Sequence, residues 1–372
     1  MNANIRIGKV FGIPIGLHSS WFLVFGLVLI SLSTGYFPQE YPQLSLITNI
    51  ILAVVTTILF FGSVLLHELG HSILAIRSGI PVKGITLFIF GGVAQITREP
   101  NSPGVEFRVA IAGPLTSLSL AGFFGLAYLL DHQIPYLAAP SIYLARINLM
   151  LALFNMIPGF PLDGGRVLRA LVWRFTGNFR RATQFASTSG QLVAFGFIGF
   201  GIFTVFTGNF MNGLWLAFIG WFLQNAASSA AYQVNFRERL RGISVLQAMD
   251  RGCPEISGLL SLNQIVQDFV LGRGQHTFFV SDADGKTVGM VTLQDITRIP
   301  KIQWRFVTAE RVMIPINRLL KFESSDDLLA TLQAMDEANI IEAPVVFQDQ
   351  LVGVISREQA RRYLRLRTDL GI

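Results

Sequence analysis

Charged residues and cysteine are scarce in this sequence. Asp, Glu, Lys and Arg together make up 14% of the 372 residues, whereas soluble domains contain about 25%. Hydrophobic residues make up 51%, and the mean hydropathy is +0.51. These values exclude an ordinary soluble protein and indicate a membrane protein, or one that contains a membrane domain. The single cysteine, Cys253, excludes a framework of intrachain disulfides.

The long apolar runs lie almost entirely before Ala231, and the remainder of the chain has the composition of a soluble protein. Six of these runs come close to the ~20 residues that a helix needs to cross a bilayer. The predicted spans are Ser19–Tyr36, Ile47–Ile76, Phe107–Leu130, Ser141–Ile157, Thr188–Phe206 and Gly213–Ala231. The net charge of +6 does not indicate nucleic acid as a partner, because the basic residues of this half flank membrane spans.

Lys and Arg are absent from three of the predicted loops, Pro38–Leu46, Asp131–Pro140 and Thr207–Asn212. The other loops are basic, and they contain Arg77, Lys83, Arg98, Arg108, Arg166, Arg169, Arg174, Arg180, Arg181, Arg237, Arg239 and Arg241. Basic loops stay on the cytoplasmic side. The pattern therefore predicts a multi-pass protein of the cell membrane with both termini in the cytoplasm. Arg146, near the outer end of the fourth span, is not explained by this scheme.

The second predicted span contains the sequence His67-Glu68-Leu69-Gly70-His71. Residues four apart share one face of a helix, so the two imidazoles can bind one metal ion, and zinc is the ion that they suit. Glu68 lies beside them and could take a proton from a water at the metal. A chance match, with the histidines packed in a core, is the alternative, but such residues inside a lipid-spanning helix are costly and call for a functional reason.

The segment between the second and third spans, Gly84–Ile96, is rich in β-branched and aromatic residues and is too short to span as a helix. It predicts one or two strands. Gly91 and Gly92 could form only a turn. Alternatively, they lie in an exposed sheet edge near the metal that captures an unfolded peptide by strand addition.

The fourth span ends in a stretch where Pro158 and Pro161 each remove a backbone donor, which predicts an unwound segment over Pro158–Gly165. Broken backbone at membrane depth is tolerated where it lines a protein-enclosed or watery cavity. Asp163 offers an oxygen ligand at this break, or it caps a helix or turn. Asn155 either bonds a neighbouring helix or holds the backbone of a substrate.

Three motifs in this order resemble the site-2 protease family of intramembrane zinc metalloproteases. They are His67–His71, Phe90-Gly91-Gly92-Val93-Ala94 and Asn155–Gly165, and together they cover the membrane half. The resemblance implies one zinc ion held by His67, His71 and Asp163, with Glu68 as general base. It also implies that Gly91, Gly92 and Asn155 handle substrate. His18, just before the first span, is expected at the membrane interface and not as a ligand.

The soluble half contains an internal duplication with a period near sixty residues, Ser244–Ile299 and Glu310–Arg362. The pattern resembles a tandem pair of CBS domains, β-α-β-β-α modules that often bind adenine nucleotides. Thr292 and Asp295 match residues that hold ribose in that family, which implies ATP, ADP or AMP as a ligand. The second copy has Gln359 in place of the acid. A purely structural or dimerising pair is the alternative, since fold alone does not establish function.

The sequence thus predicts a polytopic α-helical membrane protein, with six transmembrane helices and a short membrane-associated β-sheet, followed by a cytoplasmic α+β CBS pair. The expected domains are a protease domain over 1–235, a linker over 236–243, and CBS domains over 244–300 and 301–372. The expected partners are a single-span membrane-protein substrate, the lipid bilayer and a second copy of the chain through the CBS pair. The alternatives are a metal-binding transporter gated by the CBS pair and a silent membrane scaffold.

Overall fold

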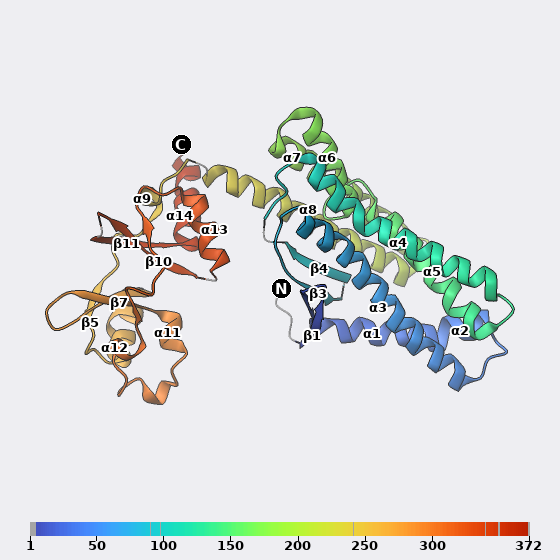
Figure 1. The fold of residues 1–372 in the computed structure, drawn as a ribbon, viewed down its shortest axis with the longest axis horizontal. Helices are drawn as coiled ribbons and strands as arrows, with labels where there is room; N and C mark the ends of the chain where they lie inside the picture. The colour runs from blue at the N-terminus through green and yellow to red at the C-terminus, as the bar shows by residue number, and fades with distance from the viewer. Residues whose placement is uncertain are drawn as a thin grey trace. The chain divides into compact units, whose positions relative to one another are not determined.

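The computed structural model describes residues 5–89, 91–96, 98–240, 242–338, 340–348 and 350–370, with only the backbone at 131, 231, 233–235, 237, 238 and 368. The chain forms two compact units, the first ending at Val234 and the second beginning at Asn235 (Figure 1). The first unit is made of long helices and one sheet. The second combines short strands and helices.

The long helices of the first unit follow the predicted spans but extend beyond several of them. They are α1 (Ser20–Ile30), continued by the π-helical η1 (Ser31–Tyr36) and by α2 (Phe37–Glu40), then α3 (Leu46–Arg77), α4 (Pro103–Asp131), α5 (Pro135–Asn155), α6 (Asp163–Thr176), α7 (Phe179–Phe206) and α8 (Phe210–Leu240), which contains the boundary between the units.

The predicted starts of the third, fourth and fifth spans were wrong by several residues, because helices begin at capping residues and not where hydropathy rises. Ser102 accepts a hydrogen bond from the Val105 amide at 3.4 Å and starts α4. Asn178 accepts from the Arg181 amide at 2.9 Å and starts α7. Both caps satisfy a backbone donor that has no partner within its helix. In α5, Pro135 occupies the first turn, where a missing N–H costs nothing.

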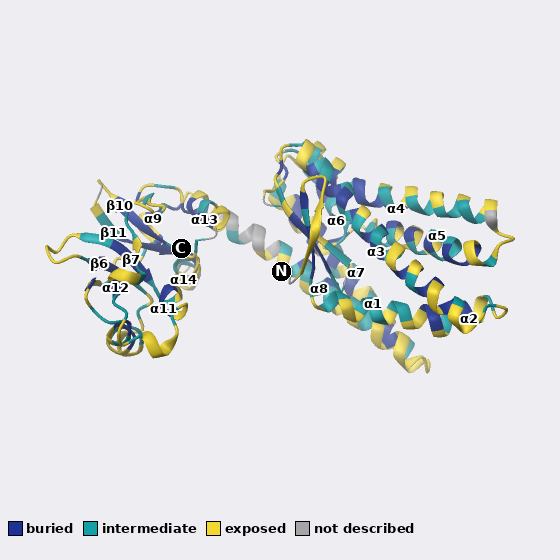
Figure 2. Cartoon of the chain, turned by 60° about the horizontal axis from the view of Figure 1, so that its bottom comes forward, coloured by how far each residue is buried: buried dark blue, intermediate teal, exposed yellow. Residues whose placement is uncertain are grey.

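Among the residues that the structure describes, five helical segments have the length and composition to cross a membrane: Ser20–Glu40, Leu46–Arg77, Pro103–Leu130, Pro135–Asn155 and Phe179–Phe206. The sixth predicted span, Gly213–Ala231, lies within α8 and stays a prediction. Large apolar side chains on these helices are exposed, among them Phe206 at 85% and Leu27 at 59%. Figure 2 shows such exposed positions along the outward faces of the helices. Exposed apolar faces of this extent are suited to lipid and not to water.

A four-stranded sheet packs against α3, with strand order β1-β2-β3-β4. Its strands are β1 (Ile5–Val10), β2 (Ile13–Leu17), β3 (Val82–Phe88) and β4 (Gly91–Ile96). The predicted strand region is therefore a hairpin of β3 and β4, and the described part of β4 pairs only with β3. Ile13, Leu17 and Ile85 of the sheet are buried against Val64 and Leu69 of α3. This contact places the β4 edge of the sheet beside the helix that carries the two histidines.

The chain is unwound between α5 and α6, as the prolines predict, but only over residues 156–162. The predicted end at Gly165 was wrong, because Asp163, Gly164 and Gly165 form the first turn of α6. Helix α7 supplies hydrogen-bond partners for this segment. The Phe160 amide donates to the Ala186 carbonyl at 3.1 Å, and the Ser189 hydroxyl donates to the Pro158 carbonyl. A side chain at Gly190 would overlap the backbone of Phe160. The irregular backbone is therefore held by direct contact with a neighbouring helix.

Helix α6 is joined to α4 by a buried ion pair between Arg169 and Glu106. Glu106 is 0% exposed and Arg169 is 8% exposed. The guanidinium also lies over the rings of Phe160 and Phe179, 4.9 and 4.7 Å from their centres. Arg169 was counted among the loop arginines that set orientation, but the structure gives it a buried structural role because α6 is folded against the bundle.

The second unit contains the β-α-β-β-α arrangement twice, as the duplication predicts. The first sheet has the order β5-β6-β7-β8 and the second β11-β10-β9. Its elements are α9 (Val245–Ala248), β5 (Glu255–Ser257), α10 (Leu262–Gln264), η2 (Ile265–Leu271), β6 (Thr277–Ser281), β7 (Thr287–Thr292), α11 (Leu293–Thr297), η3 (Lys301–Gln303), α12 (Ala309–Val312), β8 (Ile314–Pro315), β9 (Phe322–Glu323), α13 (Leu328–Glu337), β10 (Glu342–Phe347), β11 (Gln350–Ser356) and α14 (Arg357–Leu370).

Each copy of the repeat contributes its opening helix to the core of the other copy. Val245 of α9 packs with Leu328 and Ile355 of the second copy. Ala309 of α12 packs with Phe278 of the first. Because the two cores share elements in this way, we expect the copies to fold together and not as separate domains.

The buried ion pair generates a prediction about stability. Replacing Arg169 with Met leaves the Glu106 carboxylate buried and unpaired, which should lower the free energy of unfolding by about 3–5 kcal/mol. Adding Glu106→Gln to this variant should recover most of the loss. The measurement is detergent-induced unfolding of the purified protein, with Arg180→Met as the control because Arg180 is exposed. Equal stability of Arg169→Met and Arg180→Met would contradict the role of the pair.

Candidate metal centre

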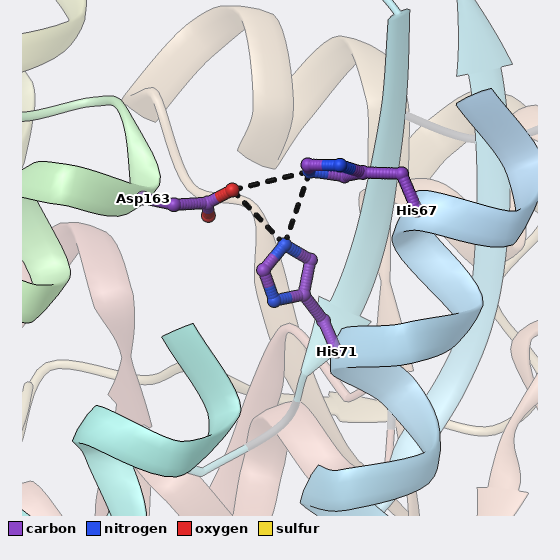
Figure 3. A group of neighbouring side chains, drawn as sticks. All are labelled: His67, His71 and Asp163. Atoms are coloured by element: carbon purple, nitrogen blue, oxygen red, sulfur yellow. Dashed lines mark hydrogen bonds and ion pairs between the residues drawn. The ribbon is translucent and has the colours of Figure 1, made fainter. Parts of the chain in front are cut away.

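Two elements bring together the three side chains of the candidate metal site (Figure 3). His67 and His71 lie one turn apart on α3 and are each 3% exposed. Asp163 is the first residue of α6, directly after the unwound segment. The Asp163 Oδ2 atom is 3.1 Å from the Nε2 atom of each histidine, and the two Nε2 atoms are 3.3 Å apart.

These distances fit one tetrahedral metal ion. Ligand atoms at about 2.0–2.1 Å from zinc lie about 3.3 Å from one another in a tetrahedron. Three donors at 3.1–3.3 Å match this spacing. In the part of the chain that the structure describes, this is the group of His, Cys, Asp and Glu side chains whose ligand atoms are close enough to share an ion. Two imidazoles and one carboxylate also leave a fourth position for a water or a substrate, as catalytic zinc sites do.

Both histidines are oriented by α4, which the sequence analysis did not connect to the site. The carbonyl of Val109 accepts a hydrogen bond from Nδ1 of His71 at 2.7 Å. A carbonyl can only accept, so the proton lies on Nδ1 and the lone pair on Nε2. The Nδ1 atom of His67 is 2.9 Å from the hydroxyl of Ser117, which is fully buried. Each ring therefore turns its Nε2 atom toward Asp163.

Helices α3 and α4 approach closely because glycines stand at their contact. A Cβ atom at Gly70 of α3 would lie 2.6 Å from the Thr116 hydroxyl. A Cβ atom at Gly113 of α4 would lie 2.6 Å from Nε2 of His67 and would overlap Nε2 of His71. Small residues allow helices to pack closely in membranes. In the sequence, Gly113 is a glycine within an apolar span, and this feature alone does not connect it with the two histidines.

Glu68 follows His67 on α3, and its side chain faces the sheet. Its side chain packs against Gly92 of β4, where a Cβ atom would overlap Cγ of Glu68 and lie 3.2 Å from Oε1. Gly91, which precedes it, has a φ of 124°, a conformation that favours glycine. Gly92 is thus required by the close approach of β4 to the carboxylate, and Gly91 by its backbone conformation, since a Cβ atom there would have no neighbour within 4 Å.

The other residues of the predicted membrane site lie on defined elements, except Phe90, which is outside the described residues. Asn155 is the last residue of α5, at the start of the unwound segment that leads to Asp163. His18 follows β2, and its Nδ1 atom is 2.8 Å from the Ser20 hydroxyl. Arg146 is exposed on α5.

Thr292 and Asp295, in the second unit, form a reciprocal cap at the start of α11. The Thr292 hydroxyl donates to Asp295 Oδ2 at 2.7 Å, and the Asp295 amide donates to the Thr292 hydroxyl at 3.4 Å. Both residues also line a cavity of about 710 Å³, together with Arg298, Arg318 and Arg362. The cap shows that this pair has a structural role. The cavity is large enough for a drug-sized ligand.

Cys253 lines the same cavity. Its sulfur donates to the Thr277 carbonyl at 3.3 Å, and burial raises the pKa of this thiol to about 12. The raised pKa keeps this thiol protonated at neutral pH, and only the thiolate form of cysteine is strongly nucleophilic.

Comparisons with known proteins find zinc metalloproteases among the proteins that this chain resembles. The sequence model of peptidase family M50 matches residues 55–137 and 131–197. A candidate zinc metalloprotease of Synechocystis is 39% identical over 96% of this chain and 94% of its own length. A zinc metalloprotease of Methanocaldococcus jannaschii is 33% identical over 80% of each chain. The solved site-2 protease of that organism is 33% identical, with a TM-score of 0.44 over 61% of this chain and 94% of its own.

The family match begins within α3, covers α4, α5 and α6, and ends within α7, so it includes the two histidines and Asp163. The relatives extend this similarity over nearly the whole chain. Together with its long apolar helices, this shows that the chain is a multi-pass membrane protein and belongs to the zinc metalloproteases of peptidase family M50.

Proposed function

We propose that this protein is an intramembrane protease that hydrolyses peptide bonds in or near the transmembrane segments of single-span membrane proteins. The observation that carries the proposal is the spacing of His67, His71 and Asp163, with Glu68 beside them. Membership of the peptidase family does not favour the alternative of a metal-binding transporter, which gives Glu68 no chemical role.

His67, His71 and Asp163 would hold one zinc ion. When bound, zinc supplies a Lewis acid that polarises the peptide carbonyl and lowers the pKa of a water at its open position. The chain supplies the remaining chemistry. Glu68 lies next to His67 on the same helix, so its carboxylate can accept the proton of the attacking water and later donate it to the leaving amine.

The substrate would bind as an extended strand along the outer edge of β4. Support comes from the order of the sheet, in which the described residues of β4 pair on one side only, and from the contact of Gly92 with Glu68. A peptide added to this edge would have its backbone held by main-chain hydrogen bonds close to the general base. Asn155, at the end of α5, is the proposed second contact with the substrate backbone.

Both termini and the second unit would lie in the cytoplasm, as the distribution of basic loops indicates. The histidines occur in the last third of α3, which by this orientation is its cytoplasmic part. The unwound segment between α5 and α6 would form one wall of the path by which water reaches the site from the cytoplasm. The second unit would bind an adenine nucleotide in the cavity beside Thr292 and Asp295, and could also join two copies of the chain.

Replacement of Glu68 by Gln removes the general base and no proposed metal ligand. We expect zinc content and folding to be unchanged and the cleavage rate to fall by about 10²–10⁴-fold or more. The measurement is cleavage of a panel of single-span helices by the purified protein, with metal analysis in parallel. Glu40→Gln, at an exposed carboxylate, is the matched control. Wild-type cleavage by Glu68→Gln would contradict the proposed mechanism.

Replacement of Asp163 by Ala should lower the zinc content of the purified protein as strongly as His67→Ala does, because each removes one of three ligands. Asp284→Ala changes an exposed carboxylate of the second unit and should retain full zinc content. If Asp163→Ala kept full zinc content and activity, the third ligand would be another residue.

Nucleotide control is tested by adding ATP, ADP and AMP and measuring both binding and cleavage rate. A coupling of about 1–3 kcal/mol would change activity by about 5- to 150-fold. Thr292→Ala and Asp295→Ala should abolish binding. Because both also remove a helix cap, Ser261→Ala is the control, since Ser261 caps α10 in the same way and does not line the cavity. Binding that leaves the rate unchanged would leave the second unit as a docking or dimerisation platform.

A further inference from the structure

One face of α4 lies directly against the two histidines. Val109, Gly113 and Ser117 are spaced four residues apart, so they follow one another along that face. All three are buried. Val109 and Ser117 bond the Nδ1 atoms of His71 and His67, and Gly113 lies between them against both Nε2 atoms.

We propose that this histidine-positioning face, Val109, Gly113 and Ser117, determines how tightly the site binds its metal. The inference rests on the proposed zinc site, and it adds residues that touch neither the ion nor the substrate. Partners that bond the second nitrogen of a metal-binding histidine fix its tautomer and ring orientation, and their loss costs about 10- to 100-fold in affinity.

The two histidines are anchored in different ways. His71 bonds the backbone carbonyl of Val109, which no substitution at that position removes. His67 bonds the side chain of Ser117, which a substitution does remove. Ser117 lies 50 residues from His67 in the sequence and is 0% exposed, so no water can replace it freely. Ser117 is therefore the position at which substitution can change the affinity of the site.

Gly113 is required for space and not for its backbone conformation. It lies inside α4, directly before Pro114, where the backbone is helical and Ala is ordinarily favoured over Gly. A Cβ atom there would nevertheless lie 2.6 Å from Nε2 of His67 and 2.6 Å from Cε1 of His71. A methyl group at this position would force apart the nitrogens that face the metal. Gly113→Ala should thus improve the helix and impair the metal site.

The same helix provides matched controls for both substitutions. Gly122 has no atom within 4 Å of its Cβ position, so Gly122→Ala changes helix propensity in the same way without touching the histidines. Ser119 is exposed, and its hydroxyl donates to the Leu115 carbonyl within the helix at 2.9 Å. Ser119→Ala therefore removes a serine hydroxyl of α4 that has no contact with the site.

The test uses the full chain purified in detergent micelles, with zinc affinity measured by competition with a chelator. Ser117→Ala should weaken zinc binding by about 10- to 100-fold, and Gly113→Ala by at least as much. Ser119→Ala and Gly122→Ala should match the wild type. At saturating Co²⁺, the visible spectrum of Ser117→Ala should differ from that of the wild type, because the His67 ring is no longer held in place. A purely structural role of Ser117 would leave that spectrum unchanged.

Wild-type zinc affinity and Co²⁺ spectrum in Ser117→Ala would overturn the inference while leaving the proposed protease intact. Circular dichroism shows whether Gly113→Ala retains its helices. If it does not, the zinc affinity and Co²⁺ spectrum of Ser117→Ala alone test the inference. A wild-type protein that binds neither zinc nor Co²⁺ would instead contradict the proposed metal site itself, and with it this inference.

Discussion

The structure depends on one constraint, which is that polar groups within a lipid-exposed helical bundle must find partners inside the protein. The two histidines of the candidate metal centre meet this constraint. Each histidine bonds α4 through one nitrogen and approaches Asp163 through the other. Asp163 in turn occupies the first turn of α6, where the helix dipole favours a negative charge. His67, His71 and Asp163 therefore form one connected unit with the groups of α4 that bond the two histidines.

The unwound segment before Asp163 is subject to the same constraint, and α7 satisfies it. Irregular backbone at this depth is tolerated only when other parts of the protein cover it. The carbonyl of Ala186 accepts from the Phe160 amide, and Gly190 allows the two backbones to touch. The buried pair of Glu106 with Arg169 then holds α6 against α4. The position of Asp163, the proposed third ligand, is thus determined by contacts to two helices, α4 and α7, that provide no proposed ligand.

Sequence patterns predict the local features of this arrangement and not the contacts between helices. A spacing of four residues places His67 and His71 on one face of a helix, and prolines end α5 ahead of Asp163. Both features are predictable because helix periodicity and helix termination by proline act within a few residues. The partner of His67 lies 50 residues away on α4, and no periodicity in either helix identifies Ser117. Arg169 was assigned to a loop for the same reason, since its burial follows from tertiary packing. The hairpin of β1 and β2 was not predicted, although Phe11-Gly12 between short apolar runs is a turn signal.

For the proposed function, the β-sheet beside the candidate metal centre meets a requirement that a transmembrane substrate imposes. The peptide bonds of a transmembrane helix are hidden in its own hydrogen bonds, and an unwound segment exposes groups that each cost several kcal/mol in hydrocarbon. An open strand edge offers the backbone of the substrate replacement partners as its helix unwinds. Gly92 places such an edge in contact with Glu68. In the proposed mechanism, main-chain hydrogen bonds to β4 therefore offset the energy of unwinding the substrate, next to the Glu68 carboxylate that accepts the proton. Cleavage would thus require β4 to bind the extended substrate as well as α3 to supply the general base.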